Sequence, residues 1–252
     1  MIIQALVVGF VQGATEFLPV SSTAHLILVS QWFGWNSFPL NLEMAAHLGT
    51  LLAVLLYFGR DWIDILTGRR IKLFWSLVLA TGVTGALALW FQPYFESIQN
   101  PLLIALTLAI FGLLLWGVDA SSAATKDDHD VPSWRQSLML GLVQALALVP
   151  GVSRSGILIT SGRYLKYSRE QAARYAFLLS APIIALSPIG SLMKDGLVGL
   201  HFDSLAWGVF VFSGLFGWLA IAWLMKLLKK TDYRWFAIYR LVLAAIIIIS
   251  LL

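Results

Sequence analysis

Two short polar stretches hold the residues that could do chemistry in an otherwise apolar chain. The first, "QGATEFLPVSSTAH", runs from Gln12 to His25 and places the carboxylate of Glu16 close to hydroxyl groups and an imidazole. The second, "VPGVSRSG", places Arg154 between two serines, just after a Pro-Gly pair. A hydroxyl or imidazole nucleophile, a nearby base and a cation that stabilises anionic charge are the groups that phosphoryl transfer requires.

The spacing of the polar residues in the first stretch is suited to one half of an active site. Gln12 and Glu16 are four residues apart, so they share one face of a helix, and Glu16 comes directly before the turn. His25 lies within the first turn of the helix that follows. Three hydroxyl residues after the proline are placed to cap that helix: Ser21, Ser22 and Thr23. The alternative interpretation is structural: helix capping alone explains the presence of any one of these hydroxyls, and Glu16 and His25 form a buried pair in which each satisfies the other.

The second stretch is suited to binding an anion. The guanidinium of Arg154 offers five donors in a fixed fork that matches phosphate, and a helix start presents free N–H groups and a positive dipole end. Six residues of the two stretches are expected to contact the phosphate or the rest of the substrate: Gln12, Ser21, Thr23, Gly151, Ser153 and Ser155. A structural ion pair between Arg154 and Glu16 is the alternative interpretation.

The composition indicates that a membrane protein carries these two stretches. The 252 residues are 59% hydrophobic and only 12% charged, which is too few charges to cover a soluble domain. The basic residues, which give a net charge of +4, fall in short clusters between apolar runs, a pattern typical of membrane topology and not of a nucleic-acid-binding face. Cysteine is absent, which excludes disulfides, thiolate metal sites and a cysteine nucleophile. The first apolar residues lack a basic start and a small-residue cleavage pattern, so we expect no removed signal peptide.

Six apolar segments come close to the roughly 20 residues that a helix needs to cross a bilayer. They are residues 42–59, 74–91, 101–118, 170–188, 204–225 and 235–252. Two further apolar regions, 1–35 and 135–165, are each interrupted by one of the polar stretches, so we predict two re-entrant hairpins of short helices. Because non-helical backbone at membrane depth is tolerated only within protein or beside a water-filled cavity, the two turns should line a cavity.

The basic residues predict the orientation in the membrane. Four loops carry thirteen of the seventeen Lys and Arg residues: 60–73, 119–135, 159–169 and 226–234. An excess of positive charge marks cytoplasmic loops, so we expect these four on the cytoplasmic side and both termini outside. The first hairpin then enters from outside and the second from the cytoplasm.

The two polar stretches also indicate an internal repeat. "GFVQGATEFLPVSST" and "GLVQALALVPGVSRS" align without a gap at an offset of 132 residues, and "EMAAH" resembles "EQAAR" at an offset of 127. Three spans in each half imply an inverted repeat, as in many transporters, of residues 1–118 and 135–252 joined by a cytoplasmic linker at 119–134. A chance match between apolar helices is the alternative. The two halves differ in chemistry. The second half has Leu148 at the position that matches Glu16, and the first half has Ser22 at the position that matches Arg154. Neither half would then be complete alone.

Two other pairs of ionisable residues lie in the predicted spans. Glu43 and His47, and Glu170 and Arg174, are each four residues apart, so each pair can form an ion pair along one helix face. We interpret both pairs as structural support and not as catalytic groups.

At these residues the chain resembles the undecaprenyl-diphosphate phosphatase family, the bacitracin-resistance membrane proteins that recycle the lipid carrier of bacterial cell-wall synthesis. "QGATE" matches the family's Glu/Gln-x-x-x-Glu motif in its Gln form, "FLPVSSTAH" continues it, and "PGVSRSG" matches the second motif. The resemblance covers essentially the whole chain. One position departs from the pattern: Leu158 stands where the family commonly has threonine, and Thr160 follows two positions later.

The resemblance implies hydrolysis of undecaprenyl diphosphate to undecaprenyl phosphate and inorganic phosphate, at the outer side of the bacterial plasma membrane. It implies an all-helical inverted repeat of six transmembrane helices and two re-entrant hairpins. It also implies a divalent cation, Mg²⁺ or Ca²⁺, for which Glu16 is the candidate ligand. We expect Glu16 to act as base or metal ligand, oriented by Gln12.

Two questions stay open at this point. The nucleophile is Ser22 activated by His25 or Glu16, or His25 itself through a phosphohistidine, or a metal-activated water. The competing class of protein is a transporter or flippase of polyprenyl phosphate lipids, which inverted repeats with broken helices favour; a non-catalytic binding protein for such lipids is a weaker third class.

Overall fold

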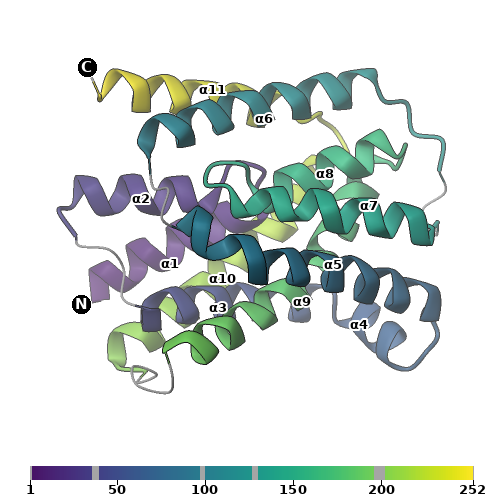
Figure 1. Cartoon of the computed structure of the whole chain (residues 1–252), viewed down its shortest axis with the longest axis horizontal. Helices are drawn as coiled ribbons and strands as arrows, with labels where there is room; N and C mark the ends of the chain where they lie inside the picture. Colours follow the sequence, from purple (N-terminus) through teal and green to yellow (C-terminus); the bar gives the residue numbers. More distant parts are fainter. Residues whose placement is uncertain (1, 36–39, 97–99, 127–129, 196–201, 252) are drawn as a thin grey trace.

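The computed structural model describes residues 2–35, 40–96, 100–126, 130–195 and 202–251, and every regular element in these residues is a helix (Figure 1). The elements are α1 (Ile2–Phe17), α2 (Ser22–Trp32), α3 (Leu40–Tyr57), α4 (Gly59–Leu66), α5 (Ile71–Glu96), α6 (Pro101–Ser121), α7 (Trp134–Ala145), a 3-10 helix η1 (Leu146–Leu148), α8 (Arg154–Tyr164), α9 (Arg169–Asp195), α10 (Ser204–Leu227) and α11 (Arg234–Ile249). Parts of three predicted segments lie outside the described residues: residue 1, residues 127–129 and residue 252.

The six predicted spans coincide with α3, α5, α6, α9, α10 and α11 to within a few residues at most ends. Four of them are long and apolar enough to cross a membrane: α3, α5 over Ile71–Phe91, α6 and α10. Large apolar side chains stay exposed on their outer faces, such as Trp90, Ile110 and Val211. Exposed apolar surface on this scale is expected where the solvent is lipid.

Each polar stretch forms the turn of a helix hairpin, α1 with α2 and α7 with α8. The two hairpins have the same layout: α1 and α7 begin 132 positions apart, at Ile2 and Trp134, and α2 and α8 are both 11 residues long. The residues that precede α2 and α8, Ser21 and Ser153, have φ angles of 73° and 72°. Left-handed backbone is uncommon for a residue other than glycine, so the same unusual turn occurs in both hairpins.

Arg240 joins the two turns to each other. Its side chain is fully buried on α11, and all of its hydrogen-bond acceptors among the described residues are backbone carbonyl oxygens. They belong to Leu108 (3.1 Å) and Thr107 (3.4 Å) of α6, Pro19 (3.4 Å) of the first turn, and Gly151 (3.0 Å) and Val152 (3.1 Å) of the second. One cation therefore gathers α6, α11 and both turns around a single point.

The second turn also needs glycine at position 151. Gly151 has a φ of 90°, and a Cβ atom there would lie 2.1 Å from the Oγ1 atom of Thr107. The Thr107 hydroxyl donates to the carbonyl oxygen of Pro150 at 2.7 Å, so α6 approaches the turn closely enough to exclude any side chain. This close approach determines the position of the turn along α6.

The four basic loops lie together at one end of the molecule, and Figure 1 shows α1 beginning and α11 ending at the other. Ion pairs connect these loops to one another and to the helix ends beside them. They are Asp61 with Arg70 (2.7 Å) and with Arg174, Asp119 with Arg163 (2.7 Å) and with Arg169 (3.0 Å), and Lys229 with Glu170 (3.9 Å).

The predicted pair of Glu170 with Arg174 was therefore wrong. Arg174 donates to Asp61, and Glu170 lies next to Lys229. Asp61 belongs to α4, a short helix that was not predicted from the sequence and that lies in the basic loop 60–73. The carboxylate of Asp61 is largely buried, whereas that of Glu170 is exposed to solvent. A buried carboxylate requires a cation more than an exposed one does, because it has lost its water.

We expect Asp119→Asn to destabilise the protein by about 3 kcal/mol, because removal of one partner leaves an uncompensated buried charge. The side chains of Asp119 and Arg163 are 2% and 4% exposed, and Arg169 also binds this carboxylate. The measurement is thermal unfolding in detergent, followed by tryptophan fluorescence. Asp64→Asn is the matched control, since Asp64 and Arg69 form an exposed pair of the kind worth less than about 1 kcal/mol. Equal melting temperatures for the two variants would contradict the assignment.

Candidate active site

Glu16, Gln12 and Ser22 form one hydrogen-bonded group where α1 turns into α2. The Oε2 atom of Glu16 accepts a hydrogen bond from Ser22 Oγ at 2.7 Å and another from Gln12 Nε2 at 3.1 Å. Gln12 and Glu16 are 1% and 8% exposed, so this carboxylate is held away from solvent. Of the two predicted activators of Ser22, the geometry brings Glu16 into contact.

His25 is directed away from this group. Its Nδ1 atom lies 2.7 Å from the carbonyl oxygen of Ser21, and its Nε2 atom lies 2.6 Å from the hydroxyl of Tyr239. A carbonyl only accepts, so Nδ1 carries a proton, and in the neutral ring Nε2 then accepts from Tyr239. The two rings are also stacked, with centroids 5.6 Å apart. The structure therefore does not bring His25 to Ser22, and attack by Nε2 on phosphorus would require Tyr239 to release it.

His47 belongs to the Glu16 group, although its spacing from Glu43 favoured a role in structural support. Its Nδ1 atom lies 3.2 Å from Gln12 Nε2, and it interacts electrostatically with both Glu16 and Arg154. The spacing of four residues along α3 indicates only Glu43 as a partner, whereas the packing of α3 against α1 supplies Gln12. The available signal was an imidazole inside an apolar span, which by default marks a functional position.

Arg154 is the cation of this group. It interacts electrostatically with Glu16 and His47 from the start of α8. Its Nη1 atom is buried and has no hydrogen-bond partner among the described residues. A buried donor without a partner costs free energy, and an anionic ligand at this point would remove that cost.

The other predicted phosphate-binding residues mainly build the turns. Ser153 Oγ accepts from the backbone N–H of Gly156 at 3.1 Å, and Ser155 Oγ donates to the carbonyl oxygen of Leu18 at 3.0 Å. Ser21 is buried and supplies its carbonyl oxygen to His25, Gly151 supplies its own to Arg240, and Thr23 is exposed. The side chain of Ser21, the N-cap residue of α2, makes no capping hydrogen bond, so the N–H groups at the start of α2 stay available to a ligand.

A second buried atom has no partner among the residues that the structure describes. It is the Oε1 atom of Gln12, a hydrogen-bond acceptor. Both hydrogen bonds that Glu16 accepts from described residues end on Oε2, which leaves its Oε1 atom to a ligand. The site therefore presents a donor from Arg154 and two acceptors from Gln12 and Glu16, the pattern expected for a phosphate group together with a proton or a cation.

Comparison with known proteins identifies the family. Residues 5–246, which include both turns, match the family described as "Bacitracin resistance protein BacA". The chain belongs to this family. Full-length relatives carry one name: undecaprenyl-diphosphatase from Caldicellulosiruptor bescii is 43% identical over 97% of this chain and 96% of its own length. Undecaprenyl-diphosphatase 2 from Stutzerimonas stutzeri is 42% identical over 98% and 97%, and undecaprenyl-diphosphatase from Aliivibrio salmonicida is 39% identical over 95% and 94%.

The position at which the chain departs from the family motif lies away from the ligand side of the turn. Leu158 is almost fully buried and packs in the apolar core. Thr160 donates its hydroxyl to the carbonyl oxygen of Gly156 at 2.8 Å, within its own helix. Neither residue offers a free hydroxyl to phosphate.

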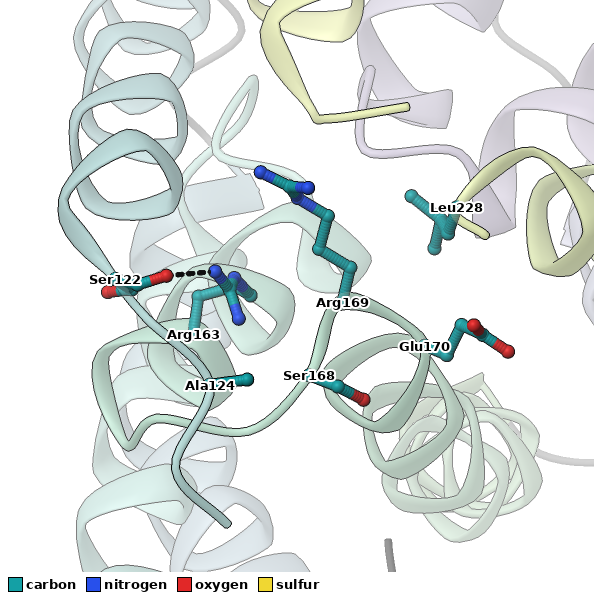
Figure 2. Close-up of a pocket in the computed structure, with 7 residues that line it drawn as sticks. All are labelled: Ser122, Ala124, Arg163, Ser168, Arg169, Glu170 and Leu228. Atoms are coloured by element: carbon teal, nitrogen blue, oxygen red, sulfur yellow. Dashed lines mark hydrogen bonds between the residues drawn. The ribbon is translucent and has the colours of Figure 1, made fainter. Parts of the chain in front are cut away.

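An open pocket of about 320 Å³ lies at the basic end of the molecule and not at the two turns (Figure 2). Ser122, Ala124, Arg163, Ser168, Arg169, Glu170 and Leu228 line it. Arg163 donates to the carbonyl oxygen of Ser122, and both arginines bind Asp119. Burial raises the pKa of Tyr233, so its phenol stays protonated and donates to the carbonyl oxygen of Arg169 at 3.0 Å. These cations already have partners, so we assign this cluster to stability.

Proposed function

We propose that this protein hydrolyses undecaprenyl diphosphate to undecaprenyl phosphate and inorganic phosphate. The observation that carries the proposal is the meeting, at the two turns, of a hydroxyl held by a carboxylate with an arginine whose buried Nη1 atom has no hydrogen-bond partner among the described residues. These are the nucleophile, base and charge stabiliser of a phosphoryl transfer. Family membership and the shared name of the full-length relatives support the same substrate.

In this proposal the terminal phosphate lies between the turns and the prenyl tail stays in lipid. Arg154 and the free N–H groups at the start of α2 hold the phosphate oxygens. Because the group is buried, these interactions are stronger than they would be in water. Arg240, which donates to carbonyl oxygens of both turns, holds the two turns together.

Ser22 is the nucleophile in the mechanism that the geometry favours. Its Oγ atom attacks the terminal phosphorus while its proton passes to Glu16 Oε2, 2.7 Å away. The bond from the terminal phosphorus to the bridging oxygen breaks, and undecaprenyl phosphate leaves with the electron pair. Glu16 passes the serine proton to the departing undecaprenyl phosphate and is again a carboxylate. It then takes a proton from a water that attacks the phosphoserine, and gives this proton to Ser22 Oγ as inorganic phosphate leaves. Arg154 stabilises the charge on the equatorial oxygens in both steps.

The resemblance implies a divalent cation, and the two acceptor oxygens of this site could supply part of its ligand set. Mg²⁺ and Ca²⁺ prefer oxygen ligands, and Mg²⁺ is commonly held by one or two carboxylates together with substrate phosphates. Glu16 Oε1 and Gln12 Oε1 would be the protein ligands. The described residues contain no group of three or more His, Asp or Glu side chains for a cation, so substrate oxygens and water would complete the ligand set. A bound cation would neutralise charge on the phosphates.

We further propose that residues 1–118 and 135–252 form an inverted repeat of three spans and one re-entrant hairpin each, in the bacterial plasma membrane. The equal layout of the two hairpins and the shared φ angles of Ser21 and Ser153 support the repeat. The gathering of the four basic loops at one end supports a cytoplasmic position for that end, with both termini outside.

The test is phosphate release from a polyprenyl diphosphate by the purified protein in detergent. We expect release in the presence of Mg²⁺ or Ca²⁺ and a large reduction when a chelator is added. A transporter or flippase would use Arg154 but has no need of the Ser22–Glu16 pair. Absence of release with every cation tried would contradict the enzyme, and lipid transfer between the leaflets of a vesicle would then be measured.

A further inference from the structure

His47 contacts Gln12, a residue of the first family motif, but does not itself belong to either motif. It lies on α3, outside both hairpins, and its Nδ1 atom lies 3.2 Å from the amide nitrogen of Gln12. The same amide nitrogen donates to Glu16 Oε2 at 3.1 Å, and Glu16 in turn accepts from Ser22. A continuous chain of hydrogen bonds therefore runs from His47 to the proposed nucleophile.

The orientation of the Gln12 amide follows from its two neighbours. With the amide reversed, its carbonyl oxygen would face the carboxylate of Glu16 and both atoms would be acceptors. In the observed orientation both N–H bonds of Gln12 are used, one by Glu16 and one by His47. As an acceptor, Nδ1 of His47 carries no proton, so the proton of the neutral ring is on Nε2.

This arrangement leaves the carbonyl oxygen of Gln12 as the free end of the amide. That atom is buried and has no partner among the described residues. Without an acceptor on the α3 side, the second N–H bond of Gln12 would also be buried without a partner, and the side chain would gain by rotating away from Glu16. His47 is the group that prevents this rotation.

We propose that His47 is a positioning residue for the hydrolysis. It holds the Gln12 amide so that Gln12 orients Glu16 toward Ser22 and presents its carbonyl oxygen to the ligand. The inference rests on the proposed function and adds to it a residue from a fourth helix, so the site is built from α1, α2, α3 and α8. His47 acts through Gln12 and does not itself contact the phosphate.

The experiment compares His47→Leu with His47→Asn in steady-state kinetics of phosphate release. The carbonyl oxygen of asparagine can take the place of Nδ1, whereas leucine offers no acceptor. We expect His47→Leu to lower kcat by about 10-fold or more with KM changed by less than about threefold, and His47→Asn to restore kcat to within about threefold of wild type. The double variant Gln12→Leu/His47→Leu should be no slower than Gln12→Leu, since both substitutions break the same chain.

Thr50→Val is the matched control on α3. The Thr50 hydroxyl donates only to carbonyl oxygens of its own helix, those of Ala46 and His47, so its loss should leave kcat unchanged. If His47→Leu does not fold, judged by its melting curve, His47→Met provides a second apolar replacement. Equal losses for the leucine and asparagine variants, or multiplied losses in the double variant, would overturn the positioning role. Wild-type release is measured first, so failure of the proposed function is recognised separately from failure of this inference.

Discussion

Arg154→Ala is expected to reduce phosphate release by about 100-fold to 1,000-fold, the range found when one preorganised donor to a transition-state oxyanion is removed. Arg154 interacts electrostatically with Glu16, and its Nη1 atom is buried without a hydrogen-bond partner among the described residues. Both binding and charge stabilisation should therefore fall, seen as a loss in kcat/KM larger than any rise in KM. Arg154→Lys, which keeps the charge but not the fork of donors, should fall between alanine and wild type.

The stability of Arg154→Ala separates this role from a structural one. Removal of Arg154 relieves a buried donor without a partner among the described residues, but it also takes a cation away from the buried carboxylate of Glu16. These two effects oppose each other, so the melting temperature in detergent should change little. Arg69→Ala, which removes an exposed cation at the basic end, is the control and should leave activity unchanged. A rate loss of less than about 10-fold, or a lower melting temperature with a proportional loss of rate, would contradict the role assigned to Arg154.

The helical architecture was predictable because its signals are local. Proline, glycine and serine in the middle of two apolar regions predicted hairpins, and the turns lie at those residues. Span length and loop charge depend only on hydropathy and counting. The short helix α4 was missed because its sequence, "GRDWIDIL", is too short and too polar to be recognised as an apolar segment.

The composition of the site was less predictable, because it depends on which helices pack together. Glu16 with Gln12 follows from a spacing of four residues, but the contact of Gln12 with His47 spans 35 positions and depends on the packing of α3 against α1. The contact of His25 with Tyr239 spans 214 positions. Arg240 had no predicted role, because its acceptors are backbone carbonyl groups, which every residue carries and no motif records.

The positions of Ser22 and His25 also show why a motif does not define a mechanism. Ser22 and His25 are three positions apart, which favours contact along a helix, yet only Ser22 is hydrogen-bonded to the carboxylate. The left-handed residue Ser21 turns the start of α2 so that its carbonyl oxygen accepts from His25 and the ring faces α11. Backbone conformation at one residue thus separates two side chains that the sequence presents together.

Ser22→Ala is the substitution for which the nucleophile assignment predicts the largest loss, about 1,000-fold or more in kcat, because no other hydroxyl among the described residues is bonded to Glu16. Glu16→Gln should lose about as much, and the double variant little more, since residues that act as a unit are not additive. Acid quenching of the wild type during turnover, followed by mass spectrometry, should detect phosphate on Ser22.

His25→Ala separates the serine route from the phosphohistidine route. In the structure Nε2 of His25 is occupied by Tyr239 and lies on the side of the ring away from Ser21, so we expect a smaller loss than for Ser22→Ala, and a similar loss for Tyr239→Phe. Near-normal turnover by Ser22→Ala would exclude the serine route and leave Glu16 as the base for a water. A complete loss for His25→Ala, together with phosphate recovered on the His25 ring of the wild type, would instead mean that the hydrogen bond to Tyr239 opens when substrate binds, and that the arrangement seen here precedes the reactive one.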